Sequence, residues 1–238
     1  MARMIRRIVV VPIALTALAL AAAPAGAATD AEIAEAGVIT DTDFTGASGR
    51  WFRSANEDSS EATQKLAKKI KSCKDYVSFA KSFATSTDAV SPEYEGNFQL
   101  LSNHSYVYKS DAAAEKAYKK AAAPGISDCL EALMTKQFEE QLKADPQSAA
   151  QIDKYRAAID EVPAVNDAVG DRSVGYAGGL EWTATDGSVD GRQVTTLVTR
   201  VGRAILSYSY SFAPNNGQPE VFDAVLANTV ARSQAAQG

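Results

Sequence analysis

The sequence predicts an α+β fold in which an antiparallel sheet packs against several helices, and three patterns support this. Apolar residues recur every three or four positions over 127–142 and 219–234, which indicates amphipathic helices. Apolar and polar residues alternate over 195–212, as they do in strands with one buried face. Strands and helices do not alternate regularly along the chain, so a parallel βαβ sheet is not indicated.

Residues 1–28 have the pattern of a secretory signal peptide. A basic start with Arg3, Arg6 and Arg7 precedes an apolar run, and Ala25-Gly26-Ala27 forms a small-x-small cleavage site. The alternative is an uncleaved membrane anchor, but the run is short for a span of about 20 residues. We therefore expect a secreted, extracellular protein with no stable membrane anchor after cleavage, and one domain over residues 29–238.

The charge of the chain argues against some classes of partner. The sequence has 24 Lys and Arg against 29 Asp and Glu, and loss of the three arginines of the signal peptide leaves 21 against 29, a net charge of −8. An acidic secreted chain has no electrostatic reason to hold nucleic acid or an anionic membrane. A small-molecule or cell-envelope ligand stays open as the partner.

Two cysteines, Cys73 and Cys129, remain after cleavage. An even number in an oxidising compartment predicts a disulfide. Such a bridge contributes about 4 kcal/mol on the chain-entropy model. The alternative is a pair of buried free thiols.

The N-terminal half predicts two helices and two strands. Residues 31–44 read as a short helix running into a turn. A longer helix is expected over 58–73, with Asp58 as its N-cap and Glu61 at the capping-box position. Aromatic and β-branched residues are common over 76–84 and 94–109, which we interpret as strands.

The middle of the chain predicts three consecutive helices. Ser110 caps the first, over 111–123, and Pro124-Gly125 ends it. The second spans 127–142. Asp145 and Pro146 begin a third helix, with Ile152, Tyr155 and Ile159 facing inward.

After Pro163 the apolar period changes to 2. Three or four short strands, separated by Gly-Gly, Asp-Gly and Val-Gly turns, predict an antiparallel meander. The helix over 219–234 then closes the chain, and together with the earlier helices it should cover the sheet.

Three candidates for catalysis are weak. Ser78 and Lys81 match S-x-x-K, but no K-T-G motif accompanies them. Ser173 is one residue out of register for a G-x-S-x-G nucleophile elbow. His104, the one histidine, cannot hold a metal alone, and we interpret it as a surface or hydrogen-bonded strand residue. We therefore expect no enzymatic activity.

Acidic patterns give no stronger signal. The stretch 186–191 superficially resembles a calcium loop, but its spacing fails and hairpin turns explain it. Acid pairs such as Glu93/Glu95 or Asp41/Asp43 could serve a glycosidase only if the fold placed them correctly. No metal or cofactor is expected.

An aromatic row along the last strand is the best candidate binding surface. If the row is open, it forms an aromatic floor with a cationic rim; if helices cover it, the same rings are core. The residues of this candidate site are Trp182, Arg200, Arg203, Tyr208 and Tyr210, with Phe212 continuing the row.

Several segments together resemble a known family. They are a Trp-bearing segment before the first Cys, "YKSDAAAEKAYKKAAAPGISDCL", "AVGDRSVGY", "TLVTRVGRAILSYSYS" and a last amphipathic helix. They are similar to secreted actinobacterial sensor-domain proteins, related to the extracellular sensor domain of mycobacterial serine/threonine kinases of the PknH type. The most telling pieces are Val169-Gly170-Asp171, the hairpin from Arg200 to Arg203, and Cys129.

The resemblance implies an antiparallel sheet with helices packed on it, a cleft, and recognition of an unidentified extracellular ligand. This chain differs from the kinases in having no kinase domain, no retained membrane helix and two cysteines where the kinase sensor resembles a two-disulfide domain. The leading hypothesis is a secreted, non-catalytic binding or sensor-like module. The alternatives are a cell-envelope structural or interaction protein and an unrecognised hydrolase.

Overall fold

A computed structural model of the chain describes residues 28–47, 49–54, 60–162 and 169–238. Within these ranges eight strands form one antiparallel sheet of order β1-β3-β4-β8-β7-β6-β5, and β2 pairs with β4. All of the predicted signal peptide except Ala28 lies outside the described residues, as does the predicted N-cap Asp58. No helix in the described ranges is both long and apolar enough to cross a bilayer.

The strands are β1 (Phe52–Arg53), β2 (Thr87–Val90), β3 (Tyr94–Gly96), β4 (Gln99–Val107), β5 (Ile152–Val162), β6 (Arg172–Ala184), β7 (Val189–Val201) and β8 (Ala204–Phe212). The α-helices are α1 (Asp30–Ala36), α2 (Ser60–Ala67), α3 (Lys74–Ala80), α4 (Asp111–Ala121), α5 (Ile126–Ala144), α6 (Pro146–Ala149) and α7 (Pro219–Gln237). Single 3₁₀ turns are η1 (Asp41–Phe44), η2 (Lys71–Cys73) and η3 (Phe83–Thr85). The predicted fold class, a mixed helix and antiparallel-sheet domain, is confirmed.

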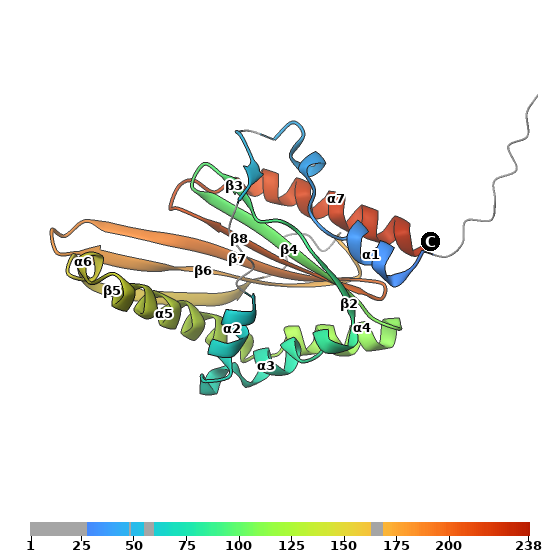
Figure 1. Cartoon of the computed structure of the whole chain (residues 1–238), viewed down its shortest axis with the longest axis horizontal. Coiled ribbons are helices and arrows are strands. Elements are labelled where there is room, and N and C mark those ends of the chain that lie inside the picture. Colours follow the sequence, from blue (N-terminus) through green and yellow to red (C-terminus); the bar gives the residue numbers. More distant parts are fainter. Residues whose placement is uncertain (1–27, 48, 55–59, 163–168) are drawn as a thin grey trace, which may run out of the picture.

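Helices cover both faces of the sheet: α1 and α7 lie on one side, and α2, α3, α4 and α5 on the other (Figure 1). Because side chains alternate along a strand, each central strand contributes to both layers. Leu206 and Tyr208 of β8 pack in the layer with α7, whereas Ile205 packs in the layer with α4. We call these two sides of the sheet the α7 face and the α5 face.

The α7 face is a closed apolar layer. One side of α7 packs on Leu197, Leu206 and Tyr208. The apolar side chains that α7 buries there are Val221, Phe222, Val225, Leu226 and Val230. Burial of each of these side chains removes apolar surface from water and stabilises the fold by about 1.5–3 kcal/mol. The predicted amphipathic helix therefore holds this layer in place.

The β7–β8 hairpin confirms the predicted Val-Gly turn. Val201 pairs with Ala204, and Gly202 between them has a positive φ of 54°. A Cβ on Gly202 would also lie 2.5 Å from Gln237 Oε1. The positive φ therefore favours glycine at this turn, whereas the Gln237 side chain is flexible enough to move aside.

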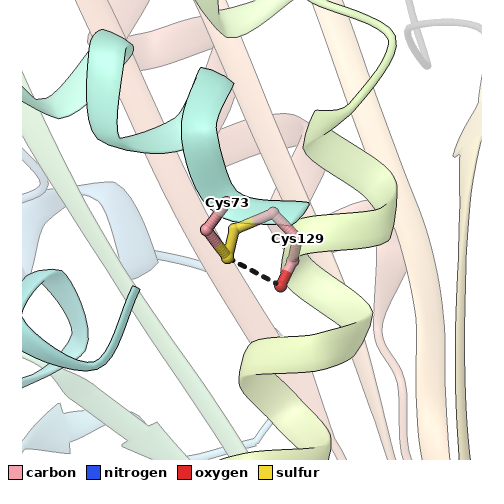
Figure 2. The surroundings of a disulfide bond; sticks show 2 residues. All are labelled: Cys73 and Cys129. Atoms are coloured by element: carbon pink, nitrogen blue, oxygen red, sulfur yellow. Dashed lines mark hydrogen bonds between the residues drawn. A yellow bond between two sulfur atoms is a disulfide. The ribbon is translucent and has the colours of Figure 1, made fainter. Parts of the chain in front are cut away.

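The cysteine prediction is also confirmed. Cys73 in η2 and Cys129 in α5 form a disulfide across a sequence separation of 56, and both side chains are fully buried (Figure 2). The bridge joins the α2–α3 segment to α5. These helices are thus fixed to one another over the α5 face.

Two predicted helices are shorter than expected. The helix expected over 58–73 ends at Ala67, and Cys73 lies in the separate turn η2.

Asp145 caps α6 as predicted, accepting a hydrogen bond from Ser148 N at 3.1 Å, but α6 ends at Ala149. The expected helix over 152–159 is wrong: these residues are in β5, where Ile159 pairs with Gly178 of β6. Tyr155 and Ile159 are four residues apart, and this spacing places two side chains on one face of a strand as well as of a helix. The register shift between Ile152 and Lys154 precedes them.

Residues 76–84 were expected as a strand but form α3 and η3. Their apolar positions Tyr76, Phe79 and Phe83 recur every three or four residues, which is the period of a helix. This helical periodicity outweighs the strand propensity of the aromatic and β-branched residues in the segment. Residues 94–109, expected as one strand, instead form the β3–β4 hairpin, which turns at Phe98 with a φ of 56°.

The predicted Gly-Gly turn is not a turn either. Gly178 and Gly179 lie inside β6. A Cβ on Gly178 would lie 1.9 Å from Ala158 O of the neighbouring strand, and one on Gly179 would lie 2.5 Å from Arg192 O. The two glycines therefore allow close strand approach in the middle of the sheet.

Candidate functional site

A partly open cavity of about 660 Å³ lies between the α5 face of the sheet and helices α2, α3 and α5. Its floor comes mainly from strands β4, β8 and β7, and its roof mainly from residues of the three helices and η3. Cavities that hold small molecules usually measure about 300–1,000 Å³. The size and position of this one make it the candidate site.

A row of hydroxyl groups crosses the floor. Ser209 of β8 pairs with Ser102 of β4 on one side and with Thr196 of β7 on the other, so the three side chains share one face. Ser207 adds a second hydroxyl on β8 and pairs with His104. Neighbouring strands are about 4.8 Å apart, so the row extends about 10 Å across three strands.

These four hydroxyls have no hydrogen-bond partner within the described part of the chain. Ser209 is also exposed, although β8 has a hydrogen-bonded strand on each side of it. A side chain in the centre of a sheet stays exposed only where the covering layer does not touch it. The cavity therefore exists because the helices bridge over the hydroxyl row instead of packing on it.

The roof is apolar. Phe79 and Phe83 form an edge-to-face pair, with ring centroids 4.8 Å apart, and Phe83 stacks on Tyr106 of β4 at 3.9 Å. This aromatic stack joins the roof to the floor at one side of the cavity. Leu130, Leu133 and Met134 of α5 continue the apolar lining.

The charge of the lining is low. Among the described residues that line the cavity, Glu93 is the one acidic residue, His104 the one histidine, and there is no Lys or Arg. Tyrosine phenols are uncharged at neutral pH, and burial raises the pKa of Tyr76 and Tyr176 further above it. Tyr176 donates a 2.7 Å hydrogen bond to Ala121 O. The cavity thus combines neutral polar groups with apolar surface.

The aromatic row predicted as a binding surface belongs to the core of the α7 face. Tyr208 and Tyr210 are 1% and 3% exposed. The Tyr210 ring stacks on Phe222 of α7 at 5.3 Å, and the Tyr208 hydroxyl lies 2.5 Å from Thr229 Oγ1. The alternative weighed from the sequence, that helices cover this row, is therefore the arrangement observed.

The other predicted binding residues lie elsewhere. Trp182 is on the opposite face of the sheet, stacked on Phe138 of α5 at 5.5 Å. Arg200 forms ion pairs with Glu115 and Asp171, at 3.4 and 3.1 Å, and Arg203 pairs with Asp30. The structure does not bring the five predicted side chains into one surface.

The catalytic candidates are not assembled into a reactive group. Ser78 lies in α3, where its carbonyl accepts a hydrogen bond from Lys120 Nζ, and Lys81 is exposed. Ser173 is hydrogen-bonded to Val169 O and Thr199 Oγ1.

The acidic candidates have structural partners. Asp41 pairs with Arg53, and Asp43 pairs with Arg232. Asp186 accepts hydrogen bonds from Ser188 in the β6–β7 turn. Within the described ranges no three His, Cys, Asp or Glu side chains are grouped closely enough to hold a metal ion.

The sequence contained a partial signal for the hydroxyl row. Ser207, Ser209 and Ser211 are the polar face of an alternating strand, which usually faces water. Only the pairing of β8 with β4 and β7 shows that Ser102 and Thr196 extend this face, and only the helices turn it into a cavity floor.

No protein-family model matches the chain, and no curated protein matches it. Among solved structures it is similar to the extracellular domain of PknH from Mycobacterium tuberculosis, with 9% identity over 88% of this chain and 100% of that one, and a TM-score of 0.48. It is also similar to the Mycobacterium smegmatis ortholog of Rv0999, with 11% identity over 87% and 98% of the two chains and a TM-score of 0.37. The first agrees with the resemblance stated from the sequence, but at these values the likeness carries no inference about what this chain binds.

Proposed function

We propose that this protein is a secreted, non-catalytic binding module that takes a small molecule into the cavity between the α5 face and helices α2, α3 and α5. The observation that supports this best is the row of unpartnered hydroxyls on the cavity floor. A sheet face that served only to pack helices would place apolar residues at Ser102, Thr196 and Ser209, as it does at Val174, Val198 and Ile205 farther along the same face.

The covalent and aromatic contacts around the cavity support a preformed site. The disulfide fixes α2 and α3 to α5, and the stack of Phe83 on Tyr106 fixes the roof to the sheet. A preformed pocket lowers the ordering cost of binding. The bridge also fits an oxidising compartment, which supports the proposed secretion.

The test uses protein recovered from the culture medium of the producing cells and two matched variants. Ser209→Phe fills the cavity from its floor. Ser211→Phe places the same ring two residues farther along the same strand face, where Ser211 accepts a hydrogen bond from Arg192 and is not part of the lining. Circular dichroism checks that both variants keep the fold.

Native mass spectrometry should show wild-type protein with an added small-molecule mass that is lost on denaturation. The Ser211→Phe variant should keep this mass and the Ser209→Phe variant should lack it. Retention of the mass by folded Ser209→Phe would place the ligand elsewhere. The absence of added mass in all three proteins would contradict the proposal and favour the cell-envelope interaction protein.

Secretion has its own test. N-terminal sequencing of protein from the medium should begin near Ala28 or Thr29, because Ala25-Gly26-Ala27 is the expected cleavage site. The first helix that the structure describes starts at the same point: Thr29 caps α1, and its backbone N donates a 2.7 Å hydrogen bond to Glu32. A product that retains Arg6 and Arg7 would mean an anchored protein.

A further inference from the structure

We infer that the cavity selects an uncharged amphiphile, a molecule with a polyhydroxy head and a hydrocarbon body such as an acylglycerol or an alkyl glycoside. This inference rests on the proposed function, and it adds the chemical class of the ligand. Three properties of the cavity lead to it: the hydroxyl floor, the apolar roof and the low charge of the lining.

The floor requires a ligand that both donates and accepts hydrogen bonds. A serine or threonine hydroxyl offers one donor and two acceptor positions. Ser102, Ser209 and Thr196 stand side by side across three strands. A head group with several hydroxyls in a row can pair with them in register, whereas a single polar atom would leave most of the row unpaired.

The roof requires that the rest of the ligand be apolar. Most side chains of α3, η3 and α5 that line the cavity are aromatic or aliphatic, and they include Phe79, Phe83, Leu130 and Met134. The exception on α5 is Gln137, which donates a 3.2 Å hydrogen bond to Thr63 Oγ1 of α2. A polar molecule without a hydrocarbon part would lose hydration against this mostly apolar surface and gain few hydrogen bonds there. A chain or ring system beside the polar head satisfies both layers.

The charges of the lining exclude ionic heads. An anion would enter a partly enclosed site in which the described lining residues include no Lys or Arg, so its desolvation would not be offset. The nearby lysines of α4, Lys116, Lys119 and Lys120, line a separate, smaller hollow with Asp75 and Ser78. A cation would meet Glu93 alone among described acidic lining residues. An uncharged head matches the floor best.

The experiment compares three amphiphiles that share one hydrocarbon chain: 1-monododecanoylglycerol, dodecanoate and dodecyltrimethylammonium. Each is titrated below its critical micelle concentration against full-length secreted protein that has been delipidated. The neutral dye N-phenyl-1-naphthylamine reports occupancy by its fluorescence, and displacement of the dye gives the affinity of each amphiphile.

The glycerol ester should bind at least about tenfold more tightly than either ion, because an unpaired charge is costly to desolvate. Ser102→Ala and Ser209→Ala should each weaken the glycerol ester by about fivefold, the usual effect of one lost hydrogen bond. The same variants should leave dye affinity unchanged. Ser211→Ala, which removes a hydroxyl outside the lining, is the matched control and should change neither affinity.

The outcomes separate this inference from the proposed function. The ligand class would be overturned by equal affinity for the three amphiphiles, by preference for an ion, or by failure of all three to displace the dye. The proposed function would survive these outcomes if Ser209→Phe abolishes dye binding. Dye binding that is absent, or unaffected by Ser209→Phe, would overturn the cavity as the binding site and both proposals with it.

Discussion

Arg232 of α7 forms a bidentate ion pair with Asp43 of η1, with Nη1 2.5 Å from Oδ1 and Nη2 2.9 Å from Oδ2. The Asp43 side chain is 1% exposed. The same guanidinium also donates to Val38 O at 2.7 Å. Arg232 thus links η1 to the last helix. This ion pair lies on the α7 face of the sheet, and the cavity lies on the opposite face.

Replacement of Arg232 should destabilise the fold. Arg232→Met should lower the free energy of unfolding by about 3 kcal/mol, because it leaves the Asp43 carboxylate buried without its counter-charge. Urea unfolding measures this. The double variant Asp43→Asn/Arg232→Met should recover part of the loss, and equal stability of Arg232→Met and wild type would show that the pair contributes nothing. Ligand binding should be unchanged, since neither residue lines the cavity.

The disulfide should matter for both stability and binding. Intact-mass analysis after alkylation without reductant should show no modified thiol. The variant Cys73→Ala/Cys129→Ala should lose about 4 kcal/mol of stability on the chain-entropy model. It should also bind N-phenyl-1-naphthylamine more weakly, because the α2–α3 segment is no longer fixed to α5. Two alkylated cysteines in the folded wild-type protein would refute the bridge.

Stability should fall in alkaline solution because buried tyrosines resist ionisation. Burial, followed by the hydrogen bond to Asp41, raises the pKa of Tyr94 to about 12. Burial also raises the pKa of Tyr176 and Tyr208. Above the usual tyrosine pKa of about 10 the unfolded chain releases these protons and the native state keeps them, so stability decreases as pH rises.

For Tyr94 this loss should begin near pH 10, the unfolded value, and continue until pH passes about 12. Urea unfolding between pH 8 and pH 12, with phenolate absorbance recorded in parallel, measures it. Tyr94→Phe should make the unfolding free energy fall less steeply as pH rises. An unfolding free energy that does not change over this range would contradict the expected pKa shifts.

No catalysis should depend on Ser78, Lys81 or His104. The Ser78 carbonyl is bound by Lys120 within the helical layer, and Lys81 is exposed. A fluorophosphonate probe should not label the native protein. Labelling that Ser78→Ala abolishes would support the hydrolase alternative instead, with heat-denatured protein as the control for nonspecific reaction.

The sequence determined those features in which local pattern and final environment agree. The alternating pattern over 195–212 indicated two strands, and Gly202 indicated their turn, because the residue at that turn adopts a positive φ. Ser110 and the apolar stripes of α5 and α7 specified helices in the same way. The disulfide followed from the number of cysteines and the inferred compartment.

Tertiary structure decided the elements whose local signals conflict. Lys74–Ala80 contains strand-forming residues, yet it is helical because Tyr76 and Phe79 reach one apolar layer only from a helix. Ile152–Val162 became a strand because β6 offered it a full edge of backbone hydrogen bonds. Spacing along the chain could not distinguish these outcomes, since both depend on partners far away in sequence.

The candidate site shows the same division. The sequence determined that Ser207 and Ser209 lie on the polar face of β8, opposite Tyr208. Only the tertiary structure decided that the tyrosine face is sealed by α7, while the serine face lies beneath a roof that does not touch it. A strand pattern records which side chains share a face, but whether that face meets water, a helix or a cavity depends on how distant segments pack over it.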